Sequence, residues 1–205
     1  GSDLLVLTRL RAWLLRRIRA RHIVENGVEW RRLEHFGIKA EVLPQIFDDP
    51  TRLALSYEHS DTPEVYVTAH PGAEDVYGLN VIEGIAASLP EVSFVIYGVN
   101  GLSKENILYR GQVESRIFDD ETSTMAGCVR LNKFDGFGEG VAKAFLRGQY
   151  VFSAIDYPHA DFTPDAATLV RKLRKLATRT RPNLEGMEYW RAELERNMDK
   201  LLCRS

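Results

Sequence analysis

The stretch FDGFGEGVAKAFLRGQYVFSA, residues 134–154, joins a charged glycine turn to a helical segment and an apolar strand. Glycine lets a backbone approach a ligand closely, and the first N–H groups of a helix carry partial positive charge. Such a turn suits a diphosphate. The same glycines also fit tight helix–sheet packing without any ligand, so the residues alone leave both interpretations open.

Other side chains could add to a site at the same place. His70 directly follows the strand VYVTA and could donate to a phosphate or a sugar, or it could cap or pack locally. Arg130 lies in the strand GCVRL and faces either a cleft or the next helix, with Asp135 near enough for a plain salt bridge. His159 could line the same cleft or be an ordinary loop residue.

Short apolar strands alternate with helical segments over much of the chain. Strands are predicted at residues 65–69, 93–99, 107–111, 127–131 and 150–154, and helices at about 79–89, 139–148 and 165–178. This alternation indicates an α/β fold, a doubly wound, Rossmann-like parallel sheet with helices on both faces. Ligands of such sheets bind outside the carboxyl ends of the strands, where the glycine turn must lie.

The two ends of the chain differ from this pattern. A short helix at about residues 29–35 is predicted to stop at Gly37, and residues 40–47 are expected to be extended. The segment MEYWRAELERNMDKLLCR is predicted to be an amphipathic helix, with Trp190, Leu194 and Leu201 among its candidate buried residues. We therefore divide the chain into a helical N-terminal segment with a linker, a Rossmann-like domain and a C-terminal helix, at residues 1–61, 62–182 and 183–205.

Six arginines fall between Arg9 and Arg21 with no acidic residue among them. Leu7, Leu10, Trp13 (or Leu14) and Ile18 recur at helical spacing, so this segment is predicted to be a basic amphipathic helix. Such a helix can lie on anionic lipid. Alternatively, it buries its apolar stripe on its own protein and leaves its arginines in solvent.

Composition limits the class of protein. With 205 residues and 44% hydrophobic content, the chain can bury one sizeable core but hardly two complete α/β domains. Its net charge of −2 gives no overall field for nucleic acid. Cys128 and Cys203 are too few and too far apart for a disulfide framework or a metal site. The sequence has no run of 18 apolar residues, so we expect no membrane-spanning helix. We expect a cytoplasmic protein in which both cysteines are reduced.

The stretch DGFGEGVAKAFLRGQYVFSA resembles a signature in the C-terminal, nucleotide-sugar-binding domain of family 4 glycosyltransferases of the GT-B fold. There an acidic residue, Gly-Phe-Gly, a helix and a strand follow in that order. EVSFVIYGVNG and NILYRGQV are similar to two further units of that domain, and HFGIKAEVLPQIF resembles the end of the N-terminal domain. The likeness covers most of the chain in element order, whereas its residue-specific part is the glycine turn.

The resemblance implies a nucleotide-diphosphate sugar as donor substrate, with no cofactor and no metal. The amides of Gly136, Phe137 and Gly138 would hold the phosphates of the donor, and Asp135 would contact hydroxyl groups of its sugar. Asp135 and Arg130 are thus the candidate catalytic residues. The sequences FDDP and FDDE would be ordinary acidic turns and not metal sites.

The resemblance also places residues along the rest of the cleft. The backbone around Gly111 and Val113 would sit by the nucleobase, with Gly98 and Asn100 lining the cleft. The family usually carries a ribose-binding glutamate where this chain has Lys143. A lysine cannot accept hydrogen bonds from ribose hydroxyls, so Lys143 either reaches a phosphate as a point charge or is a solvated helix residue.

A second departure from the family concerns the cations that neutralise the diphosphate. The family uses an Arg–Lys pair near the first βα loop, but the loop AHPGAEDVYGLN offers His70, Glu74 and Asp75. Two acids facing a diphosphate would weaken binding, so they point away or the site is altered. Arg130 and Lys133 are the nearest cationic substitutes.

We therefore expect the donor-side half of a retaining, metal-independent, hexosyltransferase-like enzyme of polysaccharide biosynthesis. A missing N-terminal domain would hold the glycan or lipid-linked acceptor, either in a longer protein or in a separately made chain. The basic helix could provide peripheral contact at the inner membrane face. Two alternatives remain: a non-catalytic subunit that binds nucleotide or glycan, which the two departures favour, and an unrelated doubly wound protein.

Overall fold

The computed structural model describes residues 2–18, 20–44, 53–132 and 136–202. Its main feature is a six-stranded, all-parallel sheet in the order β5-β4-β3-β6-β7-β8. The strands are β3 (Glu64–Thr68), β4 (Ser93–Tyr97), β5 (Ile107–Gly111), β6 (Gly127–Arg130), β7 (Tyr150–Ser153) and β8 (Asp161–Phe162). The order reverses between β3 and β6, so the predicted doubly wound topology is confirmed and its switch point lies there.

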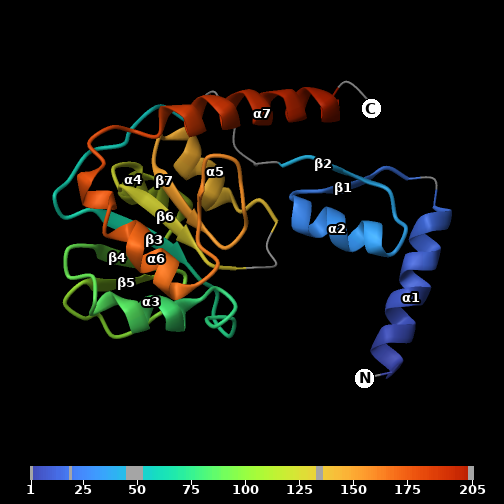
Figure 1. Ribbon diagram of the computed structural model, residues 1–205, viewed down its shortest axis with the longest axis horizontal. Coiled ribbons are helices and arrows are strands. Elements are labelled where there is room, and N and C mark those ends of the chain that lie inside the picture. Colours follow the sequence, from blue (N-terminus) through green and yellow to red (C-terminus); the bar gives the residue numbers. More distant parts are fainter. Residues whose placement is uncertain (1, 19, 45–52, 133–135, 203–205) are drawn as a thin grey trace.

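Helices cover both faces of this sheet (Figure 1). Helices α3 (Leu79–Ala86) and α6 (Ala166–Leu173) pack on one face, while α4 (Ser115–Ser123), α5 (Glu139–Leu146) and α7 (Leu184–Leu202) pack on the other. Side chains alternate along a strand, so Val65 and Val67 enter the first core and Tyr66 enters the second. The short strands are apolar on both sides because both of their faces are buried.

The C-terminal helix is anchored by aromatic stacking. The Trp190 ring of α7 stacks on Phe137 at a centroid distance of 4.5 Å and on Phe145 of α5 at 5.3 Å. Trp190 and Leu194 are buried as predicted, but Leu201 is 37% exposed. The prediction for Leu201 is wrong because the end of α7 extends beyond the sheet domain (Figure 1).

Three elements were not predicted, namely the short strand β1 (His22–Val24), α4 and β8. Residues 112–126 look polar in sequence, yet Ser115–Ser123 form α4, so FDDE lies in a helix and the acidic-turn prediction is wrong for it. The inner side of α4 is polar because Asp119 and Thr122 meet cationic side chains of α5. The helix predicted at 165–178 is shorter in the structure: α6 ends at Leu173, and the separate 3₁₀ turn η2 (Leu176–Thr178) follows it. FDDP lies outside the described residues.

The N-terminal unit, as we call β1 (His22–Val24), α2 (Gly27–His35) and β2 (Ala40–Val42), is a separate parallel pair with its crossover helix. Gly37 has φ +67° and donates its N–H to the Glu34 carbonyl, so the predicted helix stop is confirmed. Helix α7 reaches over this unit (Figure 1), where Asn197 Nδ2 donates to the Pro44 carbonyl at 3.1 Å.

Helix α1 (Ser2–Arg17) precedes the N-terminal unit, and the large apolar residues in its second half are exposed. The side chains of residues 2–9, Leu7 included, lie outside what the structure describes. Leu10, Trp13 and Leu14 are 52%, 43% and 48% exposed, and Ile18, just after the helix, is 55% exposed. Burial of this stripe on the same chain was one of two predicted alternatives, and these exposures contradict it. In the part of the chain that the structure describes, no helix combines the length and apolar character needed to cross a bilayer.

Candidate functional site

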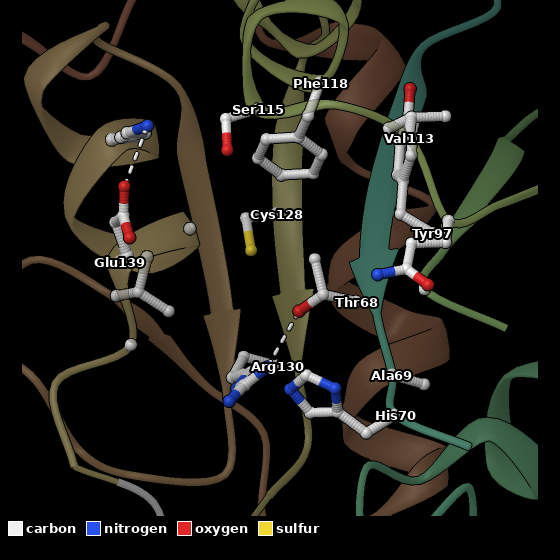
Figure 2. Close-up of a pocket in the computed structure, with 16 residues that line it drawn as sticks. Thr68, Ala69, His70, Tyr97, Val113, Ser115, Phe118, Cys128, Arg130 and Glu139 are labelled. Carbon is white, nitrogen blue, oxygen red and sulfur yellow. Dashed lines mark hydrogen bonds and ion pairs between the residues drawn. The ribbon is translucent and has the colours of Figure 1, made fainter.

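A cavity of about 320 Å³ opens at the switch point of the sheet, at the carboxyl ends of β3 and β6 (Figure 2). Its walls come from the ends of β3, β4 and β6, the start of α4 and the start of α5. Among the residues predicted for a site, it brings together His70, Gly98, Val113, Arg130, Gly138 and Lys143. Asp135 and Lys133 lie outside the described residues.

The start of α5 forms one wall of this cavity. Gly138 is the N-cap residue and has no side-chain hydrogen bond at the cap. Gly138, Glu139 and Gly140 all line the cavity, and their N–H groups have no protein acceptor among the described residues. Unpaired N–H groups at a helix start attract anions through their partial positive charge. This wall is therefore suited to a negatively charged group.

Arg130 adds a cation to the lining of the same cavity. Its Nη1 donates to Thr68 Oγ1 at 2.7 Å, and its guanidinium carbon lies 4.5 Å from the centre of the Tyr77 ring. Of the two predicted orientations, the structure shows the one in which Arg130 faces the cavity. The hydrogen bond and the aromatic ring hold the guanidinium in place, so it needs little reordering to meet an anion.

His70 lies beside Arg130 at one end of the cavity (Figure 2). The side chain is exposed, and its ring meets Tyr77 edge to face at a centroid distance of 5.4 Å. His70 is thus neither a core residue nor remote from the cavity. Tyr77 contacts the side chains of both His70 and Arg130, although the sequence analysis did not single it out.

The glycines at the nucleobase end have different surroundings. Gly98 lines the cavity with φ +91°, and a Cβ there would lie 2.1 Å from the Ala69 carbonyl oxygen. This close approach between the loops after β3 and β4 requires glycine. Gly111 and Asn100 are not among the residues that line the cavity. They pack on each other instead, and a Cβ added to Gly111 would lie 2.5 Å from Asn100 Oδ1.

Gly136 and Phe137 are not among the residues that line the cavity, and they contact other parts of the protein. The Phe137 side chain is buried against Trp190, and its backbone N–H donates to Glu25 Oε2 at 3.0 Å. The Gly136 carbonyl accepts from the Tyr157 hydroxyl at 2.6 Å. The amide predicted to bind a phosphate at Phe137 is therefore already bonded to a carboxylate of the N-terminal unit.

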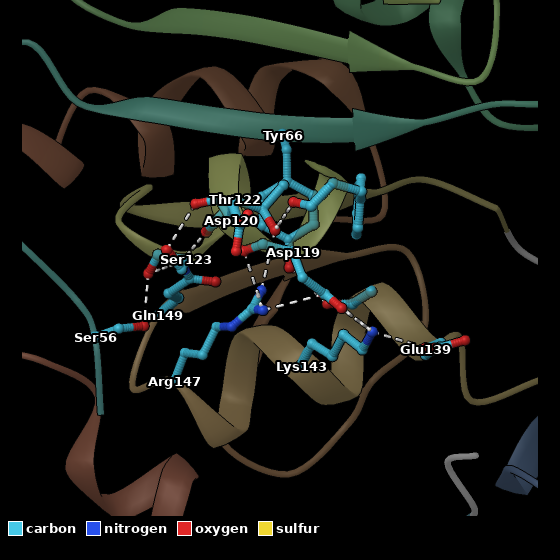
Figure 3. Close-up of polar contacts among 12 residues, drawn as sticks. Ser56, Tyr66, Asp119, Asp120, Thr122, Ser123, Glu139, Lys143, Arg147 and Gln149 are labelled. Carbon is cyan, nitrogen blue, oxygen red and sulfur yellow. Dashed lines mark hydrogen bonds and ion pairs between the residues drawn. The ribbon is translucent and has the colours of Figure 1, made fainter. Parts of the chain in front are cut away.

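Lys143 belongs to a buried ion cluster (Figure 3). Its Nζ lies 2.9 Å from Asp119 Oδ2 and 2.9 Å from Glu139 Oε1, and its side chain is 5% exposed. Arg147 Nη2 binds the same Asp119 carboxylate at 3.1 Å. The alternative of a solvated Lys143 is wrong, because this helix face packs against α4.

The acidic residues of the first βα loop do not face the cavity. Glu74 Oε1 accepts the Gly72 N–H at 3.0 Å, and hydrogen bonds from backbone N–H groups, its own first and then that of Gly72, hold the Glu74 pKa below its usual value. Asp75 lines a different hollow, beside α3 and α6. Neither carboxylate opposes an anion at the start of α5.

His159 and Cys128 differ in their relation to the cavity. His159 lies away from the cavity with φ +62°, and its ring is 5.2 Å from that of Tyr189. Cys128 is buried and lines the cavity. Within the described ranges, no group of three or more His, Cys, Asp or Glu side chains is placed to hold a metal ion.

Sequence reasoning missed several polar residues of this cavity, among them Thr68 and Glu139. Thr68 ends the strand before His70, so its position at the carboxyl edge was a usable signal. Glu139 follows the glycine turn directly, and its side chain is 46% exposed. Its carboxylate is the acceptor group that the lysine at position 143 lacks.

The chain has the fold of a GT-B glycosyltransferase domain. Three similar solved structures are the pneumococcal O-GlcNAc transferase GtfA with UDP and GlcNAc, HepE of Anabaena with UDP and glucose, and sucrose-phosphate synthase of Thermosynechococcus elongatus. Their TM-scores are 0.61, 0.68 and 0.66, their sequence identities are 16%, 10% and 13%, and the matches cover 87%, 96% and 95% of this chain.

The matches cover a smaller share of the other proteins: 43% of GtfA, 66% of HepE and 61% of the synthase. The chain therefore spans less than half the length of GtfA. No protein-family model and no curated protein matches the sequence.

Proposed function

We propose that the chain is the donor-binding part of a glycosyltransferase and that it binds a nucleotide-diphosphate sugar in the cavity at the switch point. One observation carries the proposal: Gly138, Glu139 and Gly140, whose N–H groups have no protein acceptor among the described residues, line a cavity that Arg130 also lines. A diphosphate between them would receive backbone hydrogen bonds from one side and a guanidinium charge from the other.

Other residues of the cavity would contact the rest of the donor. Val113 lies at the end where a nucleobase would pack, and Glu139 offers an acceptor for hydroxyl groups. By resemblance to family 4 glycosyltransferases, Asp135 would contact the donor sugar, and transfer would proceed with retention and without a metal. The acceptor would be a glycan or a lipid-linked sugar held by a further domain, which fits the partial coverage of GtfA.

A non-catalytic subunit is the second candidate. The Phe137 amide is bonded to Glu25, and the Lys143 ammonium is paired with Asp119 and Glu139. A complex of GtfA with GtfB is among the similar structures, with a TM-score of 0.58 and 15% identity over 88% of this chain and 44% of that one. Such a subunit would bind a nucleotide, but it would transfer no sugar from the donor even when the acceptor-binding partner is supplied.

Calorimetric titration of the 205-residue chain with UDP, GDP, ADP and their sugars tests donor binding. We expect saturable binding of at least one nucleotide, and we expect Gly138→Trp to abolish it by filling the wall of the cavity. Gly84→Trp is the matched control, since Gly84 lies on α3 with no atom within 4 Å of an added Cβ. Failure of every nucleotide to bind the unmodified chain would contradict the proposal.

We also propose peripheral membrane contact through α1. Its exposed apolar residues stand beside exposed arginines at positions 11, 16 and 17. Each arginine near an anionic surface contributes about 1 kcal/mol, so replacing all three with glutamine should lower vesicle binding roughly 100-fold.

Flotation with phosphatidylcholine vesicles, with and without phosphatidylglycerol, measures this binding. Arg116→Gln is the control, because Arg116 is an exposed arginine on α4, far along the chain from α1. Equal binding of the triple variant and the unmodified chain to the anionic vesicles would disprove membrane contact through α1.

A further inference from the structure

Glu25 connects the N-terminal unit to the glycine turn. It follows β1 directly, and its Oε2 accepts the Phe137 N–H at 3.0 Å. The backbone of Glu25 is fixed by the capping of α2, because Asn26 Oδ1 accepts from Val28 and Glu29 while Glu29 Oε2 accepts the Glu25 N–H at 2.9 Å. The carboxylate is therefore held in position by the start of one helix and aimed at the start of another.

The carboxylate also packs directly on Gly136. A Cβ added to Gly136 would lie 1.8 Å from Glu25 Oε2 and 3.0 Å from its carboxyl carbon. The absence of a side chain at Gly136 is what admits the carboxylate. A glycine of the turn therefore has a role in this structure that involves no external ligand, namely to receive an acidic side chain of the same chain.

We propose that Glu25 is a resident anion at the start of α5, so that it opposes binding of the donor's diphosphate. This inference rests on the proposed function. The Phe137 amide and those of Gly138, Glu139 and Gly140 belong to one helix start, and a negative charge on the first lowers the positive potential at the others. A diphosphate that uses the Phe137 amide must also displace the carboxylate.

The coupling runs in both directions. If Glu25 weakens diphosphate binding, a bound diphosphate must weaken the Glu25–Phe137 contact by the same factor. Docking of the N-terminal unit on the glycine turn and occupation of the cavity then exclude each other in part. Donor binding would release β1 and α2 from the turn.

Three variants separate charge from contact. Glu25→Gln keeps an acceptor for the Phe137 amide but removes the charge, Glu25→Ala removes both, and Gly136→Ala pushes the carboxylate away by its methyl group. We expect Glu25→Ala to tighten binding of UDP and of inorganic pyrophosphate about tenfold in calorimetry, with a smaller gain for Glu25→Gln. As a single substitution, Gly136→Ala should tighten binding of UDP. Combined with Glu25→Ala, it should give no further gain.

The control is Glu34→Gln, which removes an exposed carboxylate of α2 that does not touch the turn. A second readout is hydrogen exchange, in which saturating UDP should speed exchange at β1 and the first turn of α2. Unchanged or weaker UDP binding in both Glu25 variants would overturn the inference and leave the proposed function standing. Absence of UDP binding in every variant, the unmodified chain included, would overturn both.

Discussion

Replacing Arg130 with alanine is expected to weaken UDP binding about 100-fold. The guanidinium lines the same cavity as the start of α5, and Thr68 and Tyr77 hold it there. Hydrogen bonds to charged groups contribute about 1.5–3 kcal/mol each, and a 100-fold change corresponds to about 2.7 kcal/mol. Calorimetric titration of the variant with UDP measures the loss.

Two further variants make this result specific to the site. Arg130→Lys keeps the charge but loses the planar group that stacks on Tyr77, so we expect an intermediate loss of about tenfold. Arg116→Ala removes an arginine whose side chain is 82% exposed and should leave UDP affinity unchanged. An Arg130→Ala protein that binds UDP as tightly as the unmodified chain would exclude Arg130 from the site.

The second large effect concerns stability. Asp119→Ala should lower the free energy of unfolding by about 3 kcal/mol, because Lys143 and Arg147 both bind this carboxylate and both side chains are 5% exposed. Breaking a buried ion pair by removing one partner typically costs about 3–5 kcal/mol. The loss falls at the low end of that range, since Lys143 keeps Glu139 and Arg147 keeps a hydrogen bond to Thr122.

Urea unfolding of the variant and a neighbouring control tests this expectation. Asp120 is the next residue of α4, but its side chain is 70% exposed and pairs with Arg116 at 3.8 Å. Asp120→Ala should change the free energy of unfolding by less than about 0.5 kcal/mol. If the two variants are equally stable, the ion cluster contributes nothing beyond a surface pair.

The ion cluster also bears on the candidate site. Ser115 and Phe118 of α4 line the cavity, while Asp119 on the same helix joins α4 to α5. The two helices that form adjacent walls of the cavity are thus held together by the ion pairs of Asp119. Lys143, which was expected to reach a phosphate or to be solvated, lines the cavity and also joins α5 to α4 through Asp119.

Local sequence patterns were sufficient to predict five of the six strands of the main sheet. Apolar runs such as SFVIY and YVFS are short and alternate with helical segments, and each became a parallel strand. Gly37 ended its helix because a left-handed residue is needed at that position. These features depend on neighbours within a few residues, so the sequence itself displays them.

Long-range pairing decided the rest. Helix α4 looks like a polar loop until Asp119 is placed beside Lys143, 24 residues away, and Thr122 beside Arg147, 25 residues away. Glu25 meets Phe137 across 112 residues. The amino-acid sequence by itself determined most of the strands and helices, because backbone propensity and burial patterns are local. Which charge meets which charge was decided by the tertiary structure alone, since an ion pair depends on distance in space and leaves no periodic trace along the chain.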